Sequence, residues 1–121
     1  MPRFVILTHD HPMLHWDLLL EDVSAGHLLT WRLLQEPDSV TTIPAEPLSP
    51  HRLAYLDYEG PVSGNRGTVA QWDAGRYERH HSDESSETIA PFTVRLRGRR
   101  LNGIFQFSDA DRAWYRLAAE T

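Results

Sequence analysis

The sequence predicts a mainly β protein, a compact antiparallel β-barrel with short helical decorations. Two observations predict it: short apolar runs, β-branched or alternating in pattern, recur along the chain, and turn-forming residues separate them. Many short strands with regular turns are typical of barrels and sandwiches. A length of 121 residues fits one folding unit, so we expect a single domain over residues 1–121.

The first half of the chain contains three candidate strands. Arg3–Thr8 is apolar and rich in β-branched residues, Leu14–Glu21 alternates, and Leu28–Leu34 is a third strand candidate. Three prolines within Thr41–Pro50 predict an irregular connection there. The segment His51–Tyr58 fits either a strand or one helical turn, and the pattern does not decide between them.

In the middle of the chain, one more strand precedes a polar segment. Gly67–Trp72 reads as a strand that ends at Asp73-Ala74-Gly75, because these residues favour a turn. Glu78–Thr88 is charged and rich in serine, which predicts a mobile surface loop.

The last part of the chain predicts a hairpin and a closing strand. Phe92–Leu96 alternates, a Gly-Arg-Arg turn follows, and Leu101–Phe107 returns. Asp109–Ala113 is expected to form a short helical turn, and Trp114–Leu117 is expected to be the final strand.

Composition excludes several classes of function. The chain lacks cysteine, which removes disulfides, thiolate zinc sites and cysteine nucleophiles. No stretch approaches the ~20 apolar residues of a membrane span, and the N-terminal apolar run is too short for a secretory signal. A net charge of −5 disfavours broad coating of duplex DNA, although it permits an enzyme that grips one strand end. We expect a cytoplasmic protein with no membrane contact.

The residues around His15 carry the strongest chemical signal. If Leu14–Glu21 is a strand, its even-numbered positions form one apolar face, while His15 and Asp17 lie side by side on the other face. In a helix these two side chains would diverge by about 200° and would not share an ion. His9 precedes a turn containing Pro12, which can fold it back over the start of the strand.

Two imidazoles and one carboxylate suit Mn²⁺, Fe²⁺ or Zn²⁺, with positions left open for water or substrate. Alternatively, His15 and Asp17 are a pair of surface side chains that binds no metal. A different chemical class, the two-histidine, one-carboxylate site of non-haem iron oxygenases, would use His51 as its second histidine. The other histidines are expected at the surface and the tryptophans in the core. These are His11, His27, His80 and His81, and Trp16, Trp31, Trp72 and Trp114.

The chain resembles the 3′-phosphoesterase domain found at the N-terminus of bacterial ATP-dependent DNA ligase D. The family signature reads approximately HD-x-x-RLHYDFRLE, and the segment from His9 to Glu21 is similar to it. Further segments resemble the family in the same order along the chain. They are Leu29-Thr30-Trp31, His51 with Tyr55-Leu56-Asp57-Tyr58-Glu59-Gly60, Gly67-Thr68-Val69 with Trp72-Asp73, Leu101-Asn102-Gly103-Ile104-Phe105, and Trp114.

This resemblance implies a β-barrel that binds manganese and trims DNA 3′ ends during strand-break repair. Members of the family remove a terminal ribonucleoside and then the remaining 3′-phosphate. His9, His15 and Asp17 occupy the positions of the metal ligands. His51 and Tyr55 match the two remaining active-site positions, where they are expected to contact the scissile phosphate and its sugar. As a stand-alone homologue, the chain is expected to be a monomer whose ligase and polymerase partners act in trans.

Two arginines of the family signature are replaced here. Met13 and Leu19 stand where the family has arginine. Leu19 matters more, because it is expected on the same face as Asp17, where an arginine would clamp a phosphate. We expect Arg52 and Arg66 to bind substrate instead, with Arg32 as a further candidate. Alternatively, the chain is a catalytically impaired module that binds a metal and a nucleic-acid end.

Overall fold

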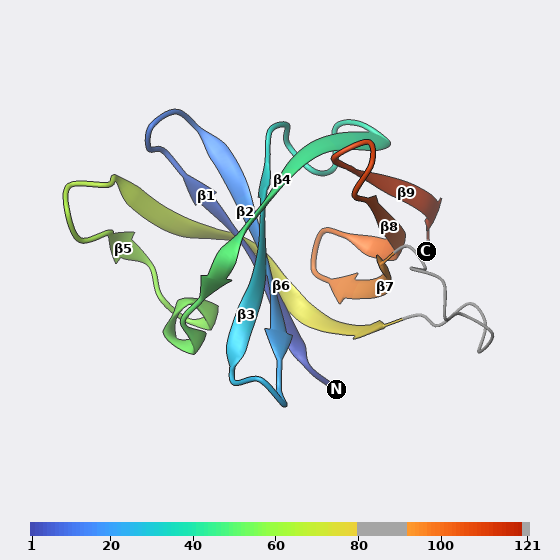
Figure 1. Cartoon of the computed structure of the whole chain (residues 1–121), viewed down its shortest axis with the longest axis horizontal. Coiled ribbons are helices and arrows are strands. Elements are labelled where there is room, and N and C mark those ends of the chain that lie inside the picture. The colour runs from blue at the N-terminus through green and yellow to red at the C-terminus, as the bar shows by residue number, and fades with distance from the viewer. Residues whose placement is uncertain (80–91, 120–121) are drawn as a thin grey trace.

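An antiparallel sheet that closes on itself forms the body of the molecule (Figure 1). The computed structural model describes residues 1–79 and 92–119. Its strands are β1 (Arg3–His9), β2 (His15–Asp22), β3 (His27–Leu33), β4 (Thr42–His51), β5 (Gly60–Pro61), β6 (Thr68–Arg79), β7 (Phe92–Gly98), β8 (Asn102–Ser108) and β9 (Ala113–Ala119). One 3₁₀ helix, η1 (Leu53–Leu56), lies between β4 and β5.

The order of pairing makes the sheet a barrel. Neighbouring strands follow the order β1-β2-β3-β4-β9-β8-β7-β6, and β6 pairs back onto β1, which closes the ring. The short strand β5 pairs with the start of β6, and β7 pairs with its end. Closure removes exposed sheet edges. The predicted antiparallel β-barrel is therefore confirmed.

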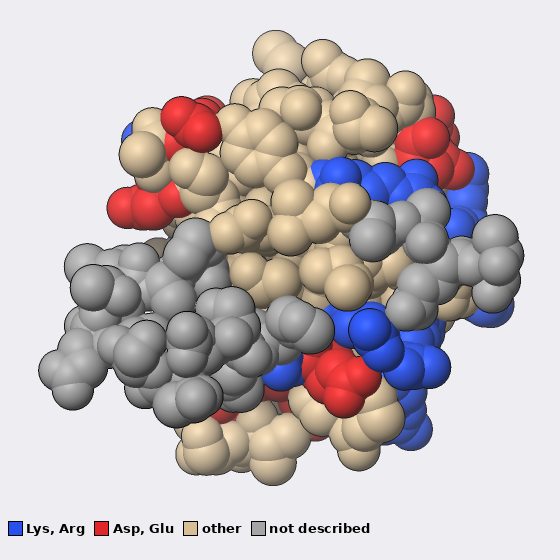
Figure 2. Space-filling model, turned by 90° about the vertical axis from the view of Figure 1, so that its right-hand side faces the viewer, with Lys and Arg blue, Asp and Glu red and all other residues tan. Residues whose placement is uncertain are grey.

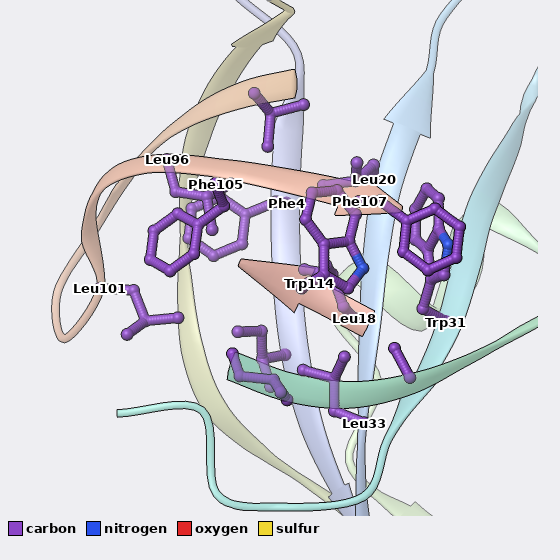
Figure 3. Close-up of a cluster of buried hydrophobic side chains, with 14 of the residues drawn as sticks. Phe4, Leu18, Leu20, Trp31, Leu33, Leu96, Leu101, Phe105, Phe107 and Trp114 are labelled. Carbon is purple, nitrogen blue, oxygen red and sulfur yellow. The ribbon is translucent and has the colours of Figure 1, made fainter. Parts of the chain in front are cut away.

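The barrel interior is filled by apolar side chains, which we call the inner cluster. Every strand of the closed ring contributes to it, as alternation requires when one face of each strand points inward. Figure 3 shows Trp114 among the labelled aromatic and leucine side chains at its centre. Its buried members are Phe4, Ile6, Leu18, Leu20, Trp31, Leu33, Ile43, Ala45, Trp72, Tyr77, Val94, Leu96, Leu101, Phe105, Phe107 and Trp114.

A second apolar cluster lies on the outside of the barrel wall, and we call it the outer cluster. Val5 and Leu7 alternate with inward-pointing neighbours on β1, so they face outward, and they are nevertheless buried. The helix η1 and the turn at residues 62–67 supply the cover. The cluster comprises Val5, Leu7, Leu19, Leu28, Leu56, Val62 and Val69.

The region predicted as an irregular connection, Thr41–Pro50, is instead the strand β4. Its pairing explains how it accommodates Pro47 and Pro50. β9 pairs only with Thr42–Pro44, so the rest of β4 has a partner on one side, β3. Proline is tolerated where the missing N–H faces no partner strand. The proline count therefore misled the prediction.

The predicted end of a strand at Asp73-Ala74-Gly75 is also wrong, because β6 runs through these residues to Arg79. Instead of stopping, the strand bends. Leu7 pairs with Gln71 whereas Ile6 pairs with Asp73, so Trp72 is an extra residue that forms a bulge. Beyond it, Gly75 fits where any Cβ would lie 2.0 Å from the Arg97 carbonyl oxygen.

Three further segments had expected secondary structures, and each has a different outcome. The segment His51–Tyr58 combines both alternatives, since His51 ends β4 and η1 follows. The helical turn expected at Asp109–Ala113 is instead a tight turn between β8 and β9, because Ala113 already pairs with Ser108. Residues 80–88 of the expected loop Glu78–Thr88, with His80 and His81, lie outside the described residues. Among the described residues, no helix has the length and apolar character needed to cross a membrane.

Candidate metal centre

The hairpin of β1 and β2 brings His9, His15 and Asp17 together. His9 and His15 are directly opposite each other in the antiparallel register, so their side chains share a face, and Asp17 follows two residues along β2 on the same face. One donor atom from each of the three residues lies within 4.8 Å of the other two. The expected grouping of these residues is present, and it lies on the outer wall of the barrel at the end of the outer cluster.

Backbone carbonyls fix the orientation of both imidazoles. The His15 Nδ1–H donates to the Met13 carbonyl at 2.9 Å, and the His9 Nε2–H donates to the Arg66 carbonyl at 2.8 Å. Because a carbonyl oxygen only accepts, each of these nitrogens carries the proton. In the neutral ring the other nitrogen then carries a lone pair, the arrangement that outer hydrogen bonds impose on metal-binding histidines.

The carboxylate of Asp17 lies between these two lone-pair nitrogens. His9 Nδ1 is 3.1 Å from Asp17 Oδ2, and His15 Nε2 is 3.1 Å from Asp17 Oδ1. Nevertheless Asp17 Oδ1 is buried and makes no hydrogen bond of acceptable geometry within the described residues. A buried carboxylate facing two acceptors is costly unless a cation or added protons lie between them. Two imidazoles and one carboxylate fit a divalent transition metal ion.

A loop from a distant part of the chain holds His9 in place. Asp10 Oδ1 accepts a hydrogen bond from the Thr68 N–H at 2.7 Å. Gly67 has a φ of +81°, and a Cβ there would lie 2.3 Å from Asp10 Oδ1. This close approach sets the Arg66 carbonyl against His9. Sequence reasoning missed Asp10 and Gly67 in this role, although both lie in the segments that resemble the family.

A pocket of about 70 Å³ adjoins the candidate metal ligands. Its polar lining combines His9 and Asp17 with His51, Tyr55 and Arg66, and the apolar residues Leu7, Val62 and Val69 complete it. The His51 Nδ1–H donates to the Ser49 carbonyl at 3.0 Å, which leaves its Nε2 to interact with a ligand. The fold therefore brings His51 and Tyr55 to the same pocket as His9 and Asp17 from a separate segment.

The arginines expected to bind substrate lie in three different places. Arg66 lines the pocket, although its guanidinium is held by Ser63 through its Nε–H at 2.7 Å to the Ser63 carbonyl. Arg52 lines a neighbouring pocket instead. Arg32 pairs with Asp17 in the register of β2 and β3, and its guanidinium lies 3.8 Å from Glu46.

The two replaced arginines have different environments. Met13 is 72% exposed, so an arginine there would reach solvent freely. Leu19 is fully buried in the outer cluster. The leucine therefore contributes to packing beneath the pocket and supplies no charge for a phosphate.

The other histidines divide as the sequence predicts, so far as the structure describes them. His11 is exposed and His27 is partly exposed near Asp22. His51 is not in the cluster of donor atoms that the described residues form, and His9 is the second histidine there. The triad expected with His51 as its second histidine is therefore not formed, although His9, His15 and Asp17 are themselves two histidines and one carboxylate. Trp31, Trp72 and Trp114 are buried and Trp16 packs against the inner cluster, as expected of core residues.

Basic side chains are also found on a face away from this site. Figure 2 shows arginines gathered on the side of the barrel that contains β7, β8 and β9 in Figure 1, whereas η1 and β5 lie on the other side. Several of these arginines have acidic neighbours: Arg97 lies 3.7 Å from Glu78, and Arg100 lies 3.3 Å from Asp38. The candidate site is thus served by few arginines.

Comparison with known families gives one match. A family model described as the DNA Ligase D 3′-phosphoesterase domain matches residues 7–108, which is most of the chain. The matched range includes every residue of the metal cluster and of the pocket beside it. No curated protein matches the chain.

Proposed function

Because the chain belongs to the DNA ligase D 3′-phosphoesterase domain family, we propose that it hydrolyses phosphoesters at the 3′ ends of DNA strands with a bound divalent metal ion. Its substrates would be a 3′-terminal ribonucleoside and a 3′-phosphate left at a strand break. The observation that carries the proposal is the buried Asp17 carboxylate, which lies 3.1 Å from one ring nitrogen of His9 and 3.1 Å from one ring nitrogen of His15.

In this proposal His9, His15 and Asp17 hold the ion, and manganese is the metal that the family resemblance favours. Such an ion, when bound, polarises a phosphoryl oxygen and lowers the pKa of a coordinated water. The Arg66 and Met13 carbonyls keep the two imidazoles in the tautomer that a metal requires. Loss of either carbonyl contact would let the rings rotate.

The neighbouring residues would act on the substrate. His51 Nε2 is placed to donate a hydrogen bond to a phosphoryl oxygen, or a proton to the leaving oxygen when the ring is protonated. Tyr55 lines the same pocket and packs against the His51 ring, with centroids 5.8 Å apart, which restricts the imidazole. Arg66 would supply positive charge after its guanidinium leaves Ser63.

The test uses a DNA primer that ends in a 3′-phosphate. With Mn²⁺ the wild type should convert this end to a hydroxyl, and His15→Ala should abolish the conversion. Mn²⁺ at about 100 times its Kd should also stabilise the wild type by roughly 2.7 kcal/mol, and His15→Ala should lose this shift. His27→Ala, which removes a histidine outside the cluster, is the matched control and should behave as wild type.

The buried Leu19, standing where the family has arginine, favours a second candidate function: a module that binds a metal and a 3′ end without turnover. The same experiment separates the two. Stabilisation by Mn²⁺ and retention of the 3′-phosphate primer, with no product across Mn²⁺, Zn²⁺ and Fe²⁺, would support the binding module. Turnover that disappears in His9→Ala would exclude it.

A further inference from the structure

A second and larger pocket adjoins the pocket of about 70 Å³ that His9 and Asp17 line. It has a volume of about 220 Å³ and is lined by Arg52, Ala54, Tyr55, Tyr58, Pro61 and Ser63. Tyr55 lines both pockets, so the two are neighbours on the η1 side of the barrel. We infer that this aromatic pocket binds the nucleobase of the 3′-terminal nucleotide, and this inference rests on the proposed function of the adjacent site.

Its aromatic walls suit a planar ring. The rings of Tyr55 and Tyr58 lie 5.7 Å apart at 86°, so they form a corner with one face and one edge available. A base stacks on an aromatic face whatever its identity, and proteins that hold single-stranded ends use this contact. The volume of about 220 Å³ lies below the roughly 300 Å³ at which pockets for drug-sized ligands begin, and it is large enough for one base.

The Tyr58 ring is held before any ligand arrives. Its hydroxyl donates a hydrogen bond to the Pro61 carbonyl. Gly60 has a φ of +136°, and a Cβ there would meet the Tyr58 hydroxyl at 3.2 Å, so the backbone passes close to the ring. A ring fixed in this way loses little entropy when a base stacks on it.

Polar groups at the same pocket suit the edges of a nucleotide. Arg52 is exposed and has no ion pair or side-chain hydrogen bond among the described residues. Its guanidinium is thus available to stack on a base or to contact the preceding phosphate. The Ser63 hydroxyl oxygen lies 3.2 Å from an Arg66 nitrogen that donates to it, so its own O–H remains to donate to a ligand.

The position of the pocket agrees with the geometry of the substrate. In a 3′-phosphorylated end, base and phosphate are attached to the same sugar, so a base site must adjoin the phosphate site. Tyr55 occupies the boundary between the two pockets, where the sugar would lie. Its ring is in contact with His51 on one side and Tyr58 on the other.

The experiment compares two primers that differ only at the last nucleotide, one carrying a base and one abasic, each with a 3′-phosphate. The wild type should favour the primer with the base by ~10-fold in kcat/KM, mainly through KM. Tyr58→Ala should reduce that ratio to near one. Tyr58→Phe, which keeps the ring, should retain it, and Tyr115→Ala is a control for loss of a tyrosine elsewhere.

A binding measurement separates this inference from the proposed catalysis. A primer with 2-aminopurine at its 3′ end should lose fluorescence on binding the wild type without added metal, and much less on binding Tyr58→Ala. Quenching without turnover would overturn the proposed hydrolysis and keep the base site. Equal quenching by wild type and a folded Tyr58→Ala, or equal kcat/KM of the wild type on both primers, would overturn the base site.

Discussion

The inner and outer clusters are both buried and apolar, but they differ in what they support. The inner cluster draws on every strand of the closed ring, so its members are held by the sheet from all sides. The outer cluster rests on β1, β2, β3 and β6 and is covered by one short helix and a turn. The stability of the barrel therefore depends mainly on the inner cluster. The shape of the candidate site depends mainly on the outer cluster.

The two clusters share the strands β1, β2, β3 and β6. On β2, Leu18 and Leu20 point inward while His15, Asp17 and Leu19 point outward. A single strand thus anchors the barrel and carries two metal-ligand candidates, which places these ligands on a rigid element. Of the residues expected to contact substrate, Tyr55 belongs to the cover, and His51 ends β4 just before η1.

The largest expected effect comes from truncating the centre of the inner cluster. Trp114 is 1% exposed, and its ring contacts Trp31 and Phe107 with centroids 5.1 and 5.5 Å away. Trp114→Ala should cost about 3–5 kcal/mol of unfolding free energy through lost burial and a cavity. In a chain of this length, Tm measured by circular dichroism should fall by about 10–20 °C.

If the two clusters act separately, Trp114→Ala should lower the stability of the whole barrel without changing the candidate metal site. At a temperature where Trp114→Ala is folded, addition of Mn²⁺ should still stabilise it, because the metal ligands lie on the other face of β1 and β2. A variant that keeps its Tm but loses the response to Mn²⁺ would show that the inner cluster shapes the site directly.

A smaller effect is expected from restoring the family's arginine in the outer cluster. Leu19→Arg would place a charge among Val5, Leu7 and Leu28, where no described acidic side chain is part of the cluster. We expect a loss of about 2–3 kcal/mol, moderated because a long side chain can extend its guanidinium toward the pocket. Urea unfolding measures the loss, and Leu19→Met, a swap of similar volume, should cost under about 1.5 kcal/mol.

This variant also tests how the chain handles phosphate. If Leu19→Arg unfolds no more easily than Leu19→Met and hydrolyses the 3′-phosphate primer faster than wild type, the outer cluster is a modified phosphate site and not a second core. Lower stability without faster hydrolysis would confirm that packing has replaced the charge at this position.

The inner cluster and the grouping of His9, His15 and Asp17 were predictable from sequence for one reason. Both depend on the two-residue alternation of strands, which is a local property. Leu18 and Leu20 on one face, with His15 and Asp17 on the other, follow from the strand assignment alone. Placing His9 opposite His15 required only that a turn join two consecutive strands.

The cover of the outer cluster was not predictable in the same way. Its parts come together through contacts between distant residues, such as Asp10 with Thr68 and Arg3 with Asp57. The prolines of β4 led to the prediction of an irregular connection, because the sequence does not reveal which side of this strand lacks a partner strand. Nor does the sequence reveal how the two expected substrate-binding arginines are placed: Arg66 lines the pocket beside His9 and Asp17, whereas Arg52 lines the neighbouring pocket.

The smallest expected effect concerns the ion pair that joins the cover to the barrel. Arg3 begins β1, and its guanidinium lies 2.5 Å from Asp57, the residue that directly follows η1. Hydrogen bonding to Arg3 holds the pKa of Asp57 below its ordinary value of 3.8. A lowered pKa means that the pair stabilises the folded state above pH 3.8, and that this contribution is lost as the pH falls through the lowered value.

Asp57→Asn should therefore be slightly less stable than wild type at pH 6, and the difference should disappear when the pH falls below the lowered pKa. Urea unfolding between pH 3 and pH 6 measures it, and added salt should shrink the difference, because the pair is exposed. Glu78→Gln, which removes an exposed carboxylate near Arg97 on the opposite side, is the matched control for stability.

Only Asp57→Asn should also raise KM for the 3′-phosphate primer, since only Asp57 holds η1 and its Tyr55. An equal KM in both variants would mean that the apolar contacts of Leu56 hold the cover unaided, and the outer cluster would then resemble the inner one in how it is stabilised.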